Sequence, residues 1–293
     1  MVGVGRCRPE TRASLARVLV VPVVLAAALL HAGWNAVAHA ISDRRAGFFL
    51  LNVAVAAVAL PLLPFVGVPA AAAWPFLAGS VALHAAYNVL LLRCYQVGEF
   101  GQTYPLARGT APLVVAVVSV TVVGQPLDLR EAGGVLAISA GLLVLVLGGG
   151  SLRAGRPAVV AALLTGLAIA TYTVLDGVGV RHAAGTLAYI VWLFALQGPL
   201  IAALVAYRRR GLLRAARPLL VPGLASGVVS LIAYGLVIWA QSRGRLATVA
   251  SLREVSIVFG ALIGAVVFHE RLGPVRVLGA MIVLSGVVLL AAG

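Results

Sequence analysis

The chain has 293 residues, of which 62% are hydrophobic and 10% are charged, and its mean hydropathy is +1.09. This composition offers too little polar surface for a soluble globular protein and predicts one that spans a membrane. The formal charge is +14, and every basic Lys or Arg position is an arginine. These arginines are spread over short connections and apolar segments, so they do not indicate a nucleic-acid partner but membrane topology and contacts with membrane lipids.

Polar breaks divide the chain into apolar runs of the length that crosses a bilayer as a helix, about 20 residues. We therefore expect an all-α polytopic membrane protein with about ten transmembrane helices, behind a basic N-terminal tail at residues 1–17. The predicted helices cover residues 18–39, 47–66, 74–95, 102–123, 130–148, 158–177, 186–206, 219–239, 247–268 and 275–291.

The forty residues that follow Arg108 and Arg253 align without a gap at an offset of 145, the difference between these two positions. The alignment predicts two five-helix repeats at residues 18–149 and 158–292, joined by a linker at 150–157. Because five is odd, the second repeat must start on the opposite side of the membrane, which makes the repeats inverted. Such repeats place a substrate site near the middle of the membrane. The alignment pairs Gly134, Gly141 and Gly148 with Gly279, Gly286 and Gly293.

The first and third predicted helices carry the same pattern of polar and aromatic residues. It reads His31-Ala32-Gly33-Trp34-Asn35 in one helix and His84-Ala85-Ala86-Tyr87-Asn88 in the other. The spacing of i and i+4 places each histidine and its asparagine on one helix face. These side chains either hydrogen-bond between helices or line a substrate pathway. No further His or Cys completes a zinc site, so we expect neither metal nor cofactor.

Arg108 and Arg253 lie inside apolar segments, where a charged residue indicates a functional site. We expect Pro105 and Gly109 to loosen the helix around Arg108. Adjacent positions on a helix diverge by about 100 degrees, so Arg253 and Glu254 are not expected to pair directly. The candidate pairs are Arg108 with Glu254 and Arg253 with Asp176, and the sequence does not choose between pairings.

Two carboxyl groups are candidates for carrying a proton during transport. Glu254 lies deep in an apolar stretch and is the first candidate, although a structural ion pair with Arg108 is the alternative. Asp176 is the second candidate and lies one turn after Tyr172. It is either a buried acid or a helix-end residue near the membrane interface.

The ten-helix pattern and several motifs resemble the EamA-type transporters of the drug/metabolite transporter superfamily. The motifs are Tyr104-Pro105-Leu106-Ala107-Arg108-Gly109, Ser251-Leu252-Arg253-Glu254, Val123-Gly124-Gln125-Pro126 and Phe268-His269-Glu270-Arg271. The resemblance covers residues 18–292 and implies a basket-shaped helical carrier. Its cavity would be lined by helices one, three, four, six, eight and nine, and its termini would be cytoplasmic. The chain has Gln125 where the fourth helix of the family usually ends in glutamate.

Loop arginines give a different orientation from the one that the resemblance implies. Eight lie on the side of the N-terminus and eleven on the opposite side. Because arginine is enriched in cytoplasmic loops, this excess would place the termini outside. We follow the resemblance and expect cytoplasmic termini.

The sequence thus predicts a secondary transporter of the plasma membrane that moves a small anionic or zwitterionic metabolite by alternating access, with or without coupling to protons. A flippase for lipid-linked sugars and an exporter of cationic drugs are the alternatives. We expect no enzyme, since an intramembrane aspartyl protease would need a second membrane-embedded aspartate besides Asp176. The fused repeats make a monomer sufficient, with a homodimer as the alternative. The predicted substrate-binding residues are Arg108, Arg253, His31, Trp34, Asn35, His84, Tyr87, Asn88, Tyr104 and Tyr172.

Overall fold

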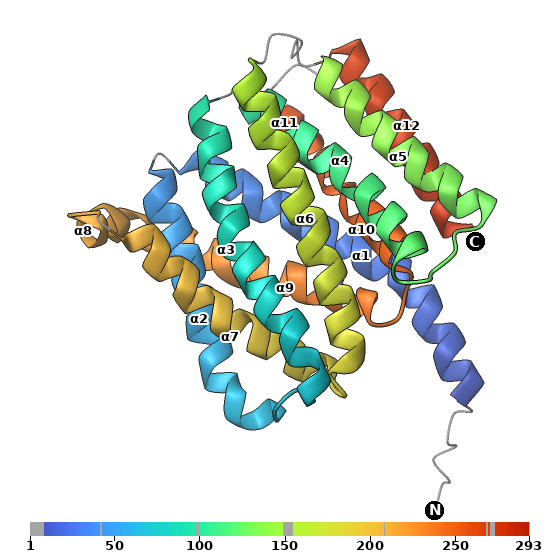
Figure 1. Ribbon diagram of the computed structural model, residues 1–293. Helices are drawn as coiled ribbons and strands as arrows, with labels where there is room; N and C mark the ends of the chain where they lie inside the picture. Colours follow the sequence, from blue (N-terminus) through green and yellow to red (C-terminus); the bar gives the residue numbers. More distant parts are fainter. Residues whose placement is uncertain are drawn as a thin grey trace, which may run out of the picture.

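The computed structural model describes residues 9–41, 43–97, 100–148, 155–207, 209–267, 269 and 273–292. Every regular element in these ranges is a helix (Figure 1). The first half contains α1 (Pro9–Ala40), α2 (Arg44–Val66), η1 (Ala71–Ala73), α3 (Trp74–Val97), α4 (Phe100–Thr121) and α5 (Leu129–Gly148). The second half contains α6 (Arg156–His182), α7 (Thr186–Ala206), α8 (Leu212–Ala216), η3 (Arg217–Leu219), α9 (Leu220–Gln241), α10 (Leu246–Arg253), α11 (Ser256–Val267) and α12 (Pro274–Ala291).

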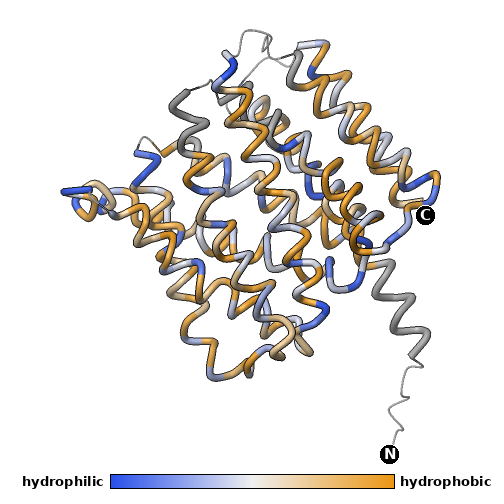
Figure 2. The backbone as a smooth tube through the Cα atoms, viewed as in Figure 1, coloured by the Kyte–Doolittle hydropathy of each residue, from blue (hydrophilic) through white to orange (hydrophobic). Residues whose placement is uncertain are grey.

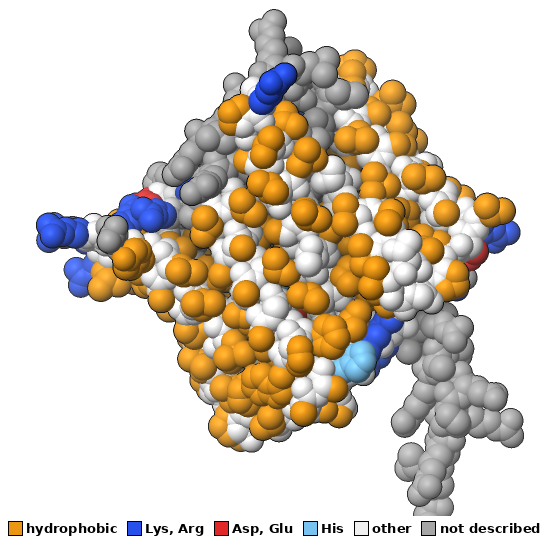
Figure 3. All heavy atoms as spheres, in the orientation of Figure 1, with side chains coloured by type: hydrophobic (Ala, Val, Ile, Leu, Met, Phe, Trp, Pro, Cys, Tyr) orange, Lys and Arg blue, Asp and Glu red, His pale blue; other side chains and the backbone are white. Residues whose placement is uncertain are grey.

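The helices are apolar on the outside of the bundle as well as in its interior. Among the described residues, eight helical segments are long and apolar enough to cross a membrane. Two further helices are α5, with 20 residues, and α4, whose apolar part includes Arg108–Thr121. Hydrophobic side chains cover most of the face shown in Figure 3, and hydrophilic residues concentrate toward the helix ends in Figure 2. Such an exterior suits lipid and not water, so the protein is a polytopic membrane protein.

The ten predicted runs correspond to α1 to α7, α9, the pair α10 and α11, and α12. The boundaries differ by a few residues at several helices and by more at α1 and at α6, which ends at His182. α1 begins at Pro9, inside the segment that was predicted as a tail. A short helical connection, α8 and η3, precedes α9.

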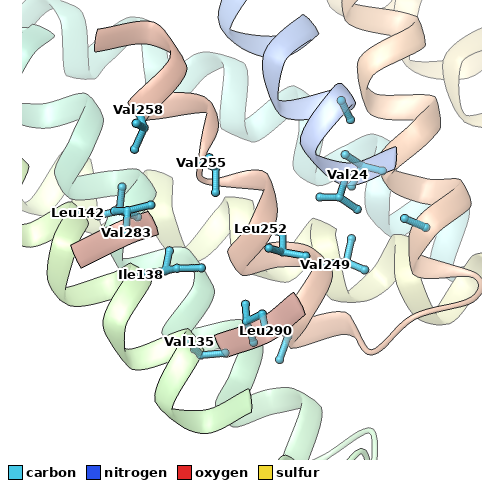
Figure 4. Packing of buried hydrophobic residues seen from close by; sticks show 14 of the residues in the cluster. Val24, Val135, Ile138, Leu142, Val249, Leu252, Val255, Val258, Val283 and Leu290 are labelled. Atoms are coloured by element: carbon cyan, nitrogen blue, oxygen red, sulfur yellow. The ribbon is translucent and has the colours of Figure 1, made fainter. Parts of the chain in front are cut away.

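The ninth predicted helix is interrupted, which hydropathy alone did not indicate. α10 ends at Arg253 and α11 begins at Ser256. The backbone N–H groups of Glu254 and Val255 donate to the carbonyls three residues earlier, at 3.1 and 3.2 Å, so the last turn of α10 is tightened. Leu252 and Val255 anchor the two sides of this break in an apolar cluster (Figure 4). In contrast, α4 continues as one helix through Pro105 and Gly109, so no break of this kind accompanies Arg108.

The two halves pack against each other as inverted repeats, and the contact between α5 and α12 shows the inversion directly. Gly134 lies against Gly286, and Gly141 lies against Gly279. The register is antiparallel, since the residue numbers rise along α5 as they fall along α12. In the repeat alignment, Gly134 corresponds to Gly279 and Gly141 corresponds to Gly286. The Gly134–Gly286 contact is therefore equivalent to the Gly141–Gly279 contact. This is the pattern expected of two equivalent surfaces related by a twofold axis.

Other helix pairs follow the same exchange. α3 packs on α6. Between the repeats, α9 corresponds to α3 and α1 corresponds to α6, and α9 and α1 also pack on each other. α2 packs on α7, and these two helices occupy equivalent positions in the two repeats. The elements that meet in the middle of the bundle therefore come from both halves of the chain.

Candidate functional site

A cavity of about 140 Å³ lies in the middle of the bundle, between helices of both repeats. It extends from Arg108 and Arg253 toward the end of the bundle where α1 meets α2, since Ala38 and Arg44 also line it. Of the predicted substrate-binding residues, those on its wall are His31, Trp34, Asn35, His84, Tyr87, Asn88, Arg108, Tyr172 and Arg253. The side chain of Tyr104 lies outside the described residues.

An acid from the second repeat holds two arginines at one end of this cavity. Nε of Arg108 lies 2.8 Å from Oε2 of Glu254. Arg253 donates from Nε and Nη2 to Oε1 of the same carboxylate, at 3.3 Å each. Arg108 also donates from Nη2 to Oγ of Ser256 at 2.8 Å. The three charged side chains are at most 4% exposed, so this is a buried cluster that joins the two repeats.

The cluster decides between the pairings that the sequence left open. Arg108 pairs with Glu254, as one of the candidates proposed. The expectation that Arg253 and Glu254 would diverge was wrong, because α10 ends between them and the turn brings the neighbouring side chains together. Arg253 therefore contacts Glu254 and not Asp176, which was the other candidate partner.

The repeated histidine motifs line the cavity, and hydrogen bonds within one helix orient their polar side chains. Asn35 and Asn88 each donate an amide hydrogen bond of 2.8 Å to the carbonyl of the histidine one turn earlier. Trp34 Nε1 donates to Nδ1 of His31 at 3.3 Å. These bonds stay within α1 and α3, a common local pattern for such side chains. The motifs thus form part of the cavity wall and do not link helices through these bonds.

Aromatic rings from four helices pack beside the histidine of α3. The rings of His84 and Tyr172 stack with 4.0 Å between centroids. Tyr172 also meets Tyr234 edge to face at 6.0 Å, and Tyr234 meets Phe194 at 6.3 Å. Such contacts hold large, flat side chains in defined positions. One side of the cavity is consequently a rigid aromatic surface.

Sequence reasoning missed Tyr234 and Phe194 as cavity residues. Tyr234 follows Ser230 by one turn in an otherwise apolar run of α9, and both line the cavity. This polar pair at i and i+4 was the available signal. Phe194 carries no such signal, since an aromatic residue in an apolar helix faces lipid or interior equally well.

Asp176 lies behind this aromatic surface and is completely buried. It accepts hydrogen bonds from the hydroxyls of Tyr189 at 3.0 Å and Tyr234 at 2.5 Å. The interfacial position considered from the sequence is therefore wrong. Neither Asp176 nor Glu254 belongs to the cavity wall, but Tyr234 joins Asp176 to it.

At the opposite end of the bundle, polar contacts tie together the connections between helices. Arg181 at the end of α6 donates to the carbonyls of Gln241 and Gly244, at 2.8 and 2.5 Å from Nη2. Arg245 forms an ion pair with Glu131 of α5. Gln125 accepts a hydrogen bond of 3.1 Å from the backbone N–H of Leu246. These contacts join the α4–α5 connection, α6 and the α9–α10 connection.

No group of three His, Cys, Asp or Glu side chains that could hold a metal ion occurs in the described part of the chain. The site offers guanidinium groups, amides, hydroxyls and aromatic faces. These groups can hold a small organic molecule by charge, hydrogen bonds and apolar contact.

The fold and parts of the sequence match known proteins. Residues 156–292 match the model of the EamA-like transporter family. No curated protein matches the chain at a significant level. One solved crystal structure, whose title names no function, aligns with a TM-score of 0.73 and 17% identity over 94% of this chain and 97% of that chain. This similarity shows the fold alone. The second repeat, residues 156–292, thus belongs to the EamA-like transporter family, and this match supports the chain's resemblance to the EamA-type transporters of the drug/metabolite transporter superfamily.

Proposed function

We propose that this protein is a secondary transporter of the plasma membrane that moves a small anionic or zwitterionic metabolite through its central cavity. The observation that carries the proposal is the meeting of Arg108 and Arg253, one from each repeat, at the end of that cavity. Burying two arginines is costly in a membrane protein, and a position on a substrate pathway gives a reason for it.

The two ends of the bundle support transport by alternating access. The cavity reaches Arg44 at the start of α2, while the opposite end is held by Arg181, Arg245 and their partners. Inverted repeats can exchange such arrangements, because each half can adopt the conformation of the other. A second state would then break the contacts of Arg181 and Arg245 and form others near α1 and α2. We expect the termini on the cytoplasmic side.

We propose Asp176 as the proton-linked carboxyl group, in place of Glu254, which was the first candidate from the sequence. Glu254 contacts two guanidinium groups, and these ion pairs give it a structural task. Asp176 accepts hydrogen bonds from two tyrosine hydroxyls, which hold a carboxyl group without balancing its charge. Tyr234 lines the cavity and donates a hydrogen bond to Asp176, so a substrate that contacts Tyr234 would change the hydrogen bonding of the acid.

The test begins with thermal unfolding of the purified full chain with panels of small anions, zwitterions and cations. A bound ligand raises the unfolding temperature by mass action. Compounds that do so are then measured by counterflow in liposomes, in the wild type, Arg108→Ala and Arg253→Ala. Arg214→Ala in the exposed α8 serves as the control. We expect both central variants to lose stabilisation and counterflow, and the control to keep them.

Other outcomes identify the alternatives. Transport of a lipid-linked sugar without flux of soluble compounds would indicate a flippase. Stabilisation by cations alone would indicate a cationic drug exporter. Ligand shifts that stay unchanged in both arginine variants would contradict the central site.

A further inference from the structure

The repeated motifs place one histidine each on the cavity wall, His31 from α1 and His84 from α3. A neutral imidazole has one ring nitrogen with a proton, which donates, and one without, which accepts. The hydrogen bond at one nitrogen therefore fixes what the other can offer to a ligand. In both histidines Nδ1 is bonded within its own helix, and no residue in the described part of the chain hydrogen-bonds to either Nε2.

Trp34 decides the position of the proton in His31. An indole N–H can only donate, and Nε1 of Trp34 donates to Nδ1 of His31 at 3.3 Å. Nδ1 must then carry a lone pair, so the single proton of this ring is on Nε2. A second proton would set one N–H against another. His31 consequently offers the cavity a hydrogen-bond donor.

The backbone of Ser80 gives His84 the opposite arrangement. Nδ1 of His84 lies 2.9 Å from the carbonyl oxygen of Ser80, which can only accept, so Nδ1 carries the proton and donates. The ring is buried, and burial disfavours a second proton that would charge it. The nearby acid, Asp176, accepts its hydrogen bonds from Tyr189 and Tyr234 and not from this ring. Nε2 of His84 keeps a lone pair and offers the cavity an acceptor.

The difference follows from neighbours that the two motifs do not share. One turn before the histidine, α3 has Ser80, whose hydroxyl also lies 3.2 Å from Nδ1, whereas α1 has Ala27. Three residues after the histidine, α1 has a tryptophan that can only donate, whereas α3 has Tyr87, whose hydroxyl can also accept. Two motifs that look equivalent in sequence thus present opposite partners to the cavity.

Ring contacts hold both imidazoles in place. His31 meets Trp34 edge to face with 5.1 Å between centroids. His84 stacks on Tyr172 at 4.0 Å and meets Tyr234 edge to face at 5.5 Å. Groups that are held in advance lose little freedom when they bind a ligand. The cavity of about 140 Å³ that they share has room for one small organic molecule, so both nitrogens meet the same ligand.

We infer that the cavity selects a small molecule with a hydrogen-bond acceptor and a separate O–H or N–H donor, as in a hydroxy acid. The acceptor lies on Nε2–H of His31 and the donor on Nε2 of His84. The inference rests on the proposed function, because it assigns the ligand of the same cavity. It depends on hydrogen bonds and not on the balance of charge. A simple carboxylate satisfies only His31 and leaves the acceptor of His84 unpaired.

Nitrogen NMR of the purified full chain, isotope-labelled at histidine, tests the two tautomers directly, because protonated and unprotonated ring nitrogens differ in chemical shift. We expect the proton on Nε2 in His31 and on Nδ1 in His84, with signals assigned by their loss in His31→Phe and His84→Phe. Trp34→Phe should let His31 populate both tautomers and leave His84 unchanged. Trp192→Phe is the matched control, since Trp192 donates to the carbonyl of Gly67 and neither residue lines the cavity.

Ligands that differ in one donor test the contact of His84. Mandelate has a carboxylate and a hydroxyl, phenylacetate lacks the hydroxyl, and O-methylmandelate keeps the oxygen without its proton. One comparison compound is smaller than mandelate and the other is larger, so size alone would not weaken both. In calorimetry with the purified full chain, we expect mandelate to bind at least about fivefold more tightly than either, because each leaves a polar group of the site unpaired.

Variants separate the two contacts. His84→Phe keeps a ring against Tyr172 and should abolish the preference for mandelate over O-methylmandelate. His31→Phe removes the donor to the shared carboxylate, so it should weaken all three compounds at least about fivefold and keep that preference. His182→Phe is the control and should bind like the wild type, because His182 stacks on Phe76 outside the cavity wall. The wild-type comparison of the three compounds stands even where a variant does not fold.

The outcomes separate this inference from the proposed function. The same tautomer in His31 and His84, or a second proton on either ring, would overturn the inference. Equal binding of the three compounds to the wild type, or binding of none of them, would also overturn it and leave the transporter in place. Counterflow of no compound from the wider panel of anions, zwitterions and cations, in protein that folds, would instead contradict the proposed transport function.

Discussion

Nε of Arg108 lies 2.8 Å from Oε2 of Glu254, so the arginine of the first repeat is paired with an acid of the second. Arg253 shares the same carboxylate, and all three side chains are nearly inaccessible. Such a cluster links the halves of the protein as well as placing charge beside the cavity. Its two tasks can be separated by changing one member at a time.

Glu254→Gln should be the most damaging single change in this cluster. It leaves two buried guanidinium groups without their carboxylate, and breaking a buried ion pair typically costs about 3–5 kcal/mol. Arg108→Gln retains the contact between Arg253 and Glu254 and should cost less. The double variant Arg108→Gln/Glu254→Gln restores the net charge and should recover part of the loss. Thermal and denaturant unfolding of the four proteins provides this comparison, and an additive double variant would contradict the pairing.

The glycine contacts between α5 and α12 predict a position-specific effect of alanine. A Cβ at Gly134 would lie 2.6 Å from Cγ of Leu290 and 3.0 Å from the carbonyl oxygen of Gly286. Gly134→Ala should therefore lower the free energy of unfolding by about 1–3 kcal/mol through overpacking. At the neighbouring Gly133 a Cβ would meet Leu289 at an ordinary 3.8 Å, so Gly133→Ala is a matched control. Equal unfolding temperatures for the two variants would argue against this close approach.

Much of the fold and part of the site could be predicted from sequence, for a physical reason. Lipid requires each crossing segment to be a long apolar helix, so the runs were visible as hydropathy. Polar residues such as His31 and Asn88 are conspicuous in such runs, and they do line the cavity. The break at Glu254 was not visible, because it lies in a continuous apolar run and accompanies a contact with Arg108 of the other repeat. Phe194 was missed because an aromatic residue in an apolar helix suits lipid and cavity alike.

Tyr234→Phe should uncouple transport from protons if Asp176 carries them. The change removes the 2.5 Å hydrogen bond to Asp176 from the tyrosine that also lines the cavity. Tyr189→Phe removes the other bond, of 3.0 Å, without touching the cavity wall, and is the matched control. Both variants should lose stability by about 1–3 kcal/mol, since each leaves a buried acceptor less satisfied.

The two tyrosine variants should differ in transport. Tyr234→Phe and Asp176→Asn should lose accumulation driven by a pH gradient across liposomes while keeping counterflow. Tyr189→Phe should keep both activities. If Asp176→Asn still accumulates substrate in response to a pH gradient, Asp176 does not carry the proton.

Arg181→Gln should loosen the end of the bundle opposite Arg44. Arg181 donates to the carbonyls of Gln241 and Gly244, and its loss frees the α9–α10 connection. Hydrogen exchange measured by mass spectrometry should become faster at residues 241–246, since their protection depends on this contact. Arg243→Gln is the control on the same connection, because Arg243 stacks on Trp239 and lies outside the contacts with α6. Equal exchange in the two variants would contradict the proposal that Arg181 holds this end of the bundle together.

The connection between α1 and α2 predicts a pH dependence of stability. Asp43 caps α2 through the backbone N–H of Ala46, at 3.0 Å, and accepts hydrogen bonds from Arg209, of which that from Nη1 is 2.9 Å. These bonds, with that from Arg209 the stronger, hold the pKa of the Asp43 carboxyl below its ordinary value. A lowered pKa means that the contribution to stability is complete above the ordinary pKa, about 3.9, and is lost as the pH falls through the folded-state value.

Asp43→Asn separates this charge from the helix cap. Asparagine also caps helices well, so the variant keeps the bond to Ala46 and loses the charge that faces Arg209. Above pH 5 the wild type should unfold at a higher temperature than the variant, by an amount that reflects at most about 1 kcal/mol for a partly exposed pair. The difference should shrink as the pH falls toward 3, because the wild-type carboxyl then takes up a proton. A difference that stays constant over this range would show that the charge of Asp43 does not hold the α1–α2 connection to Arg209.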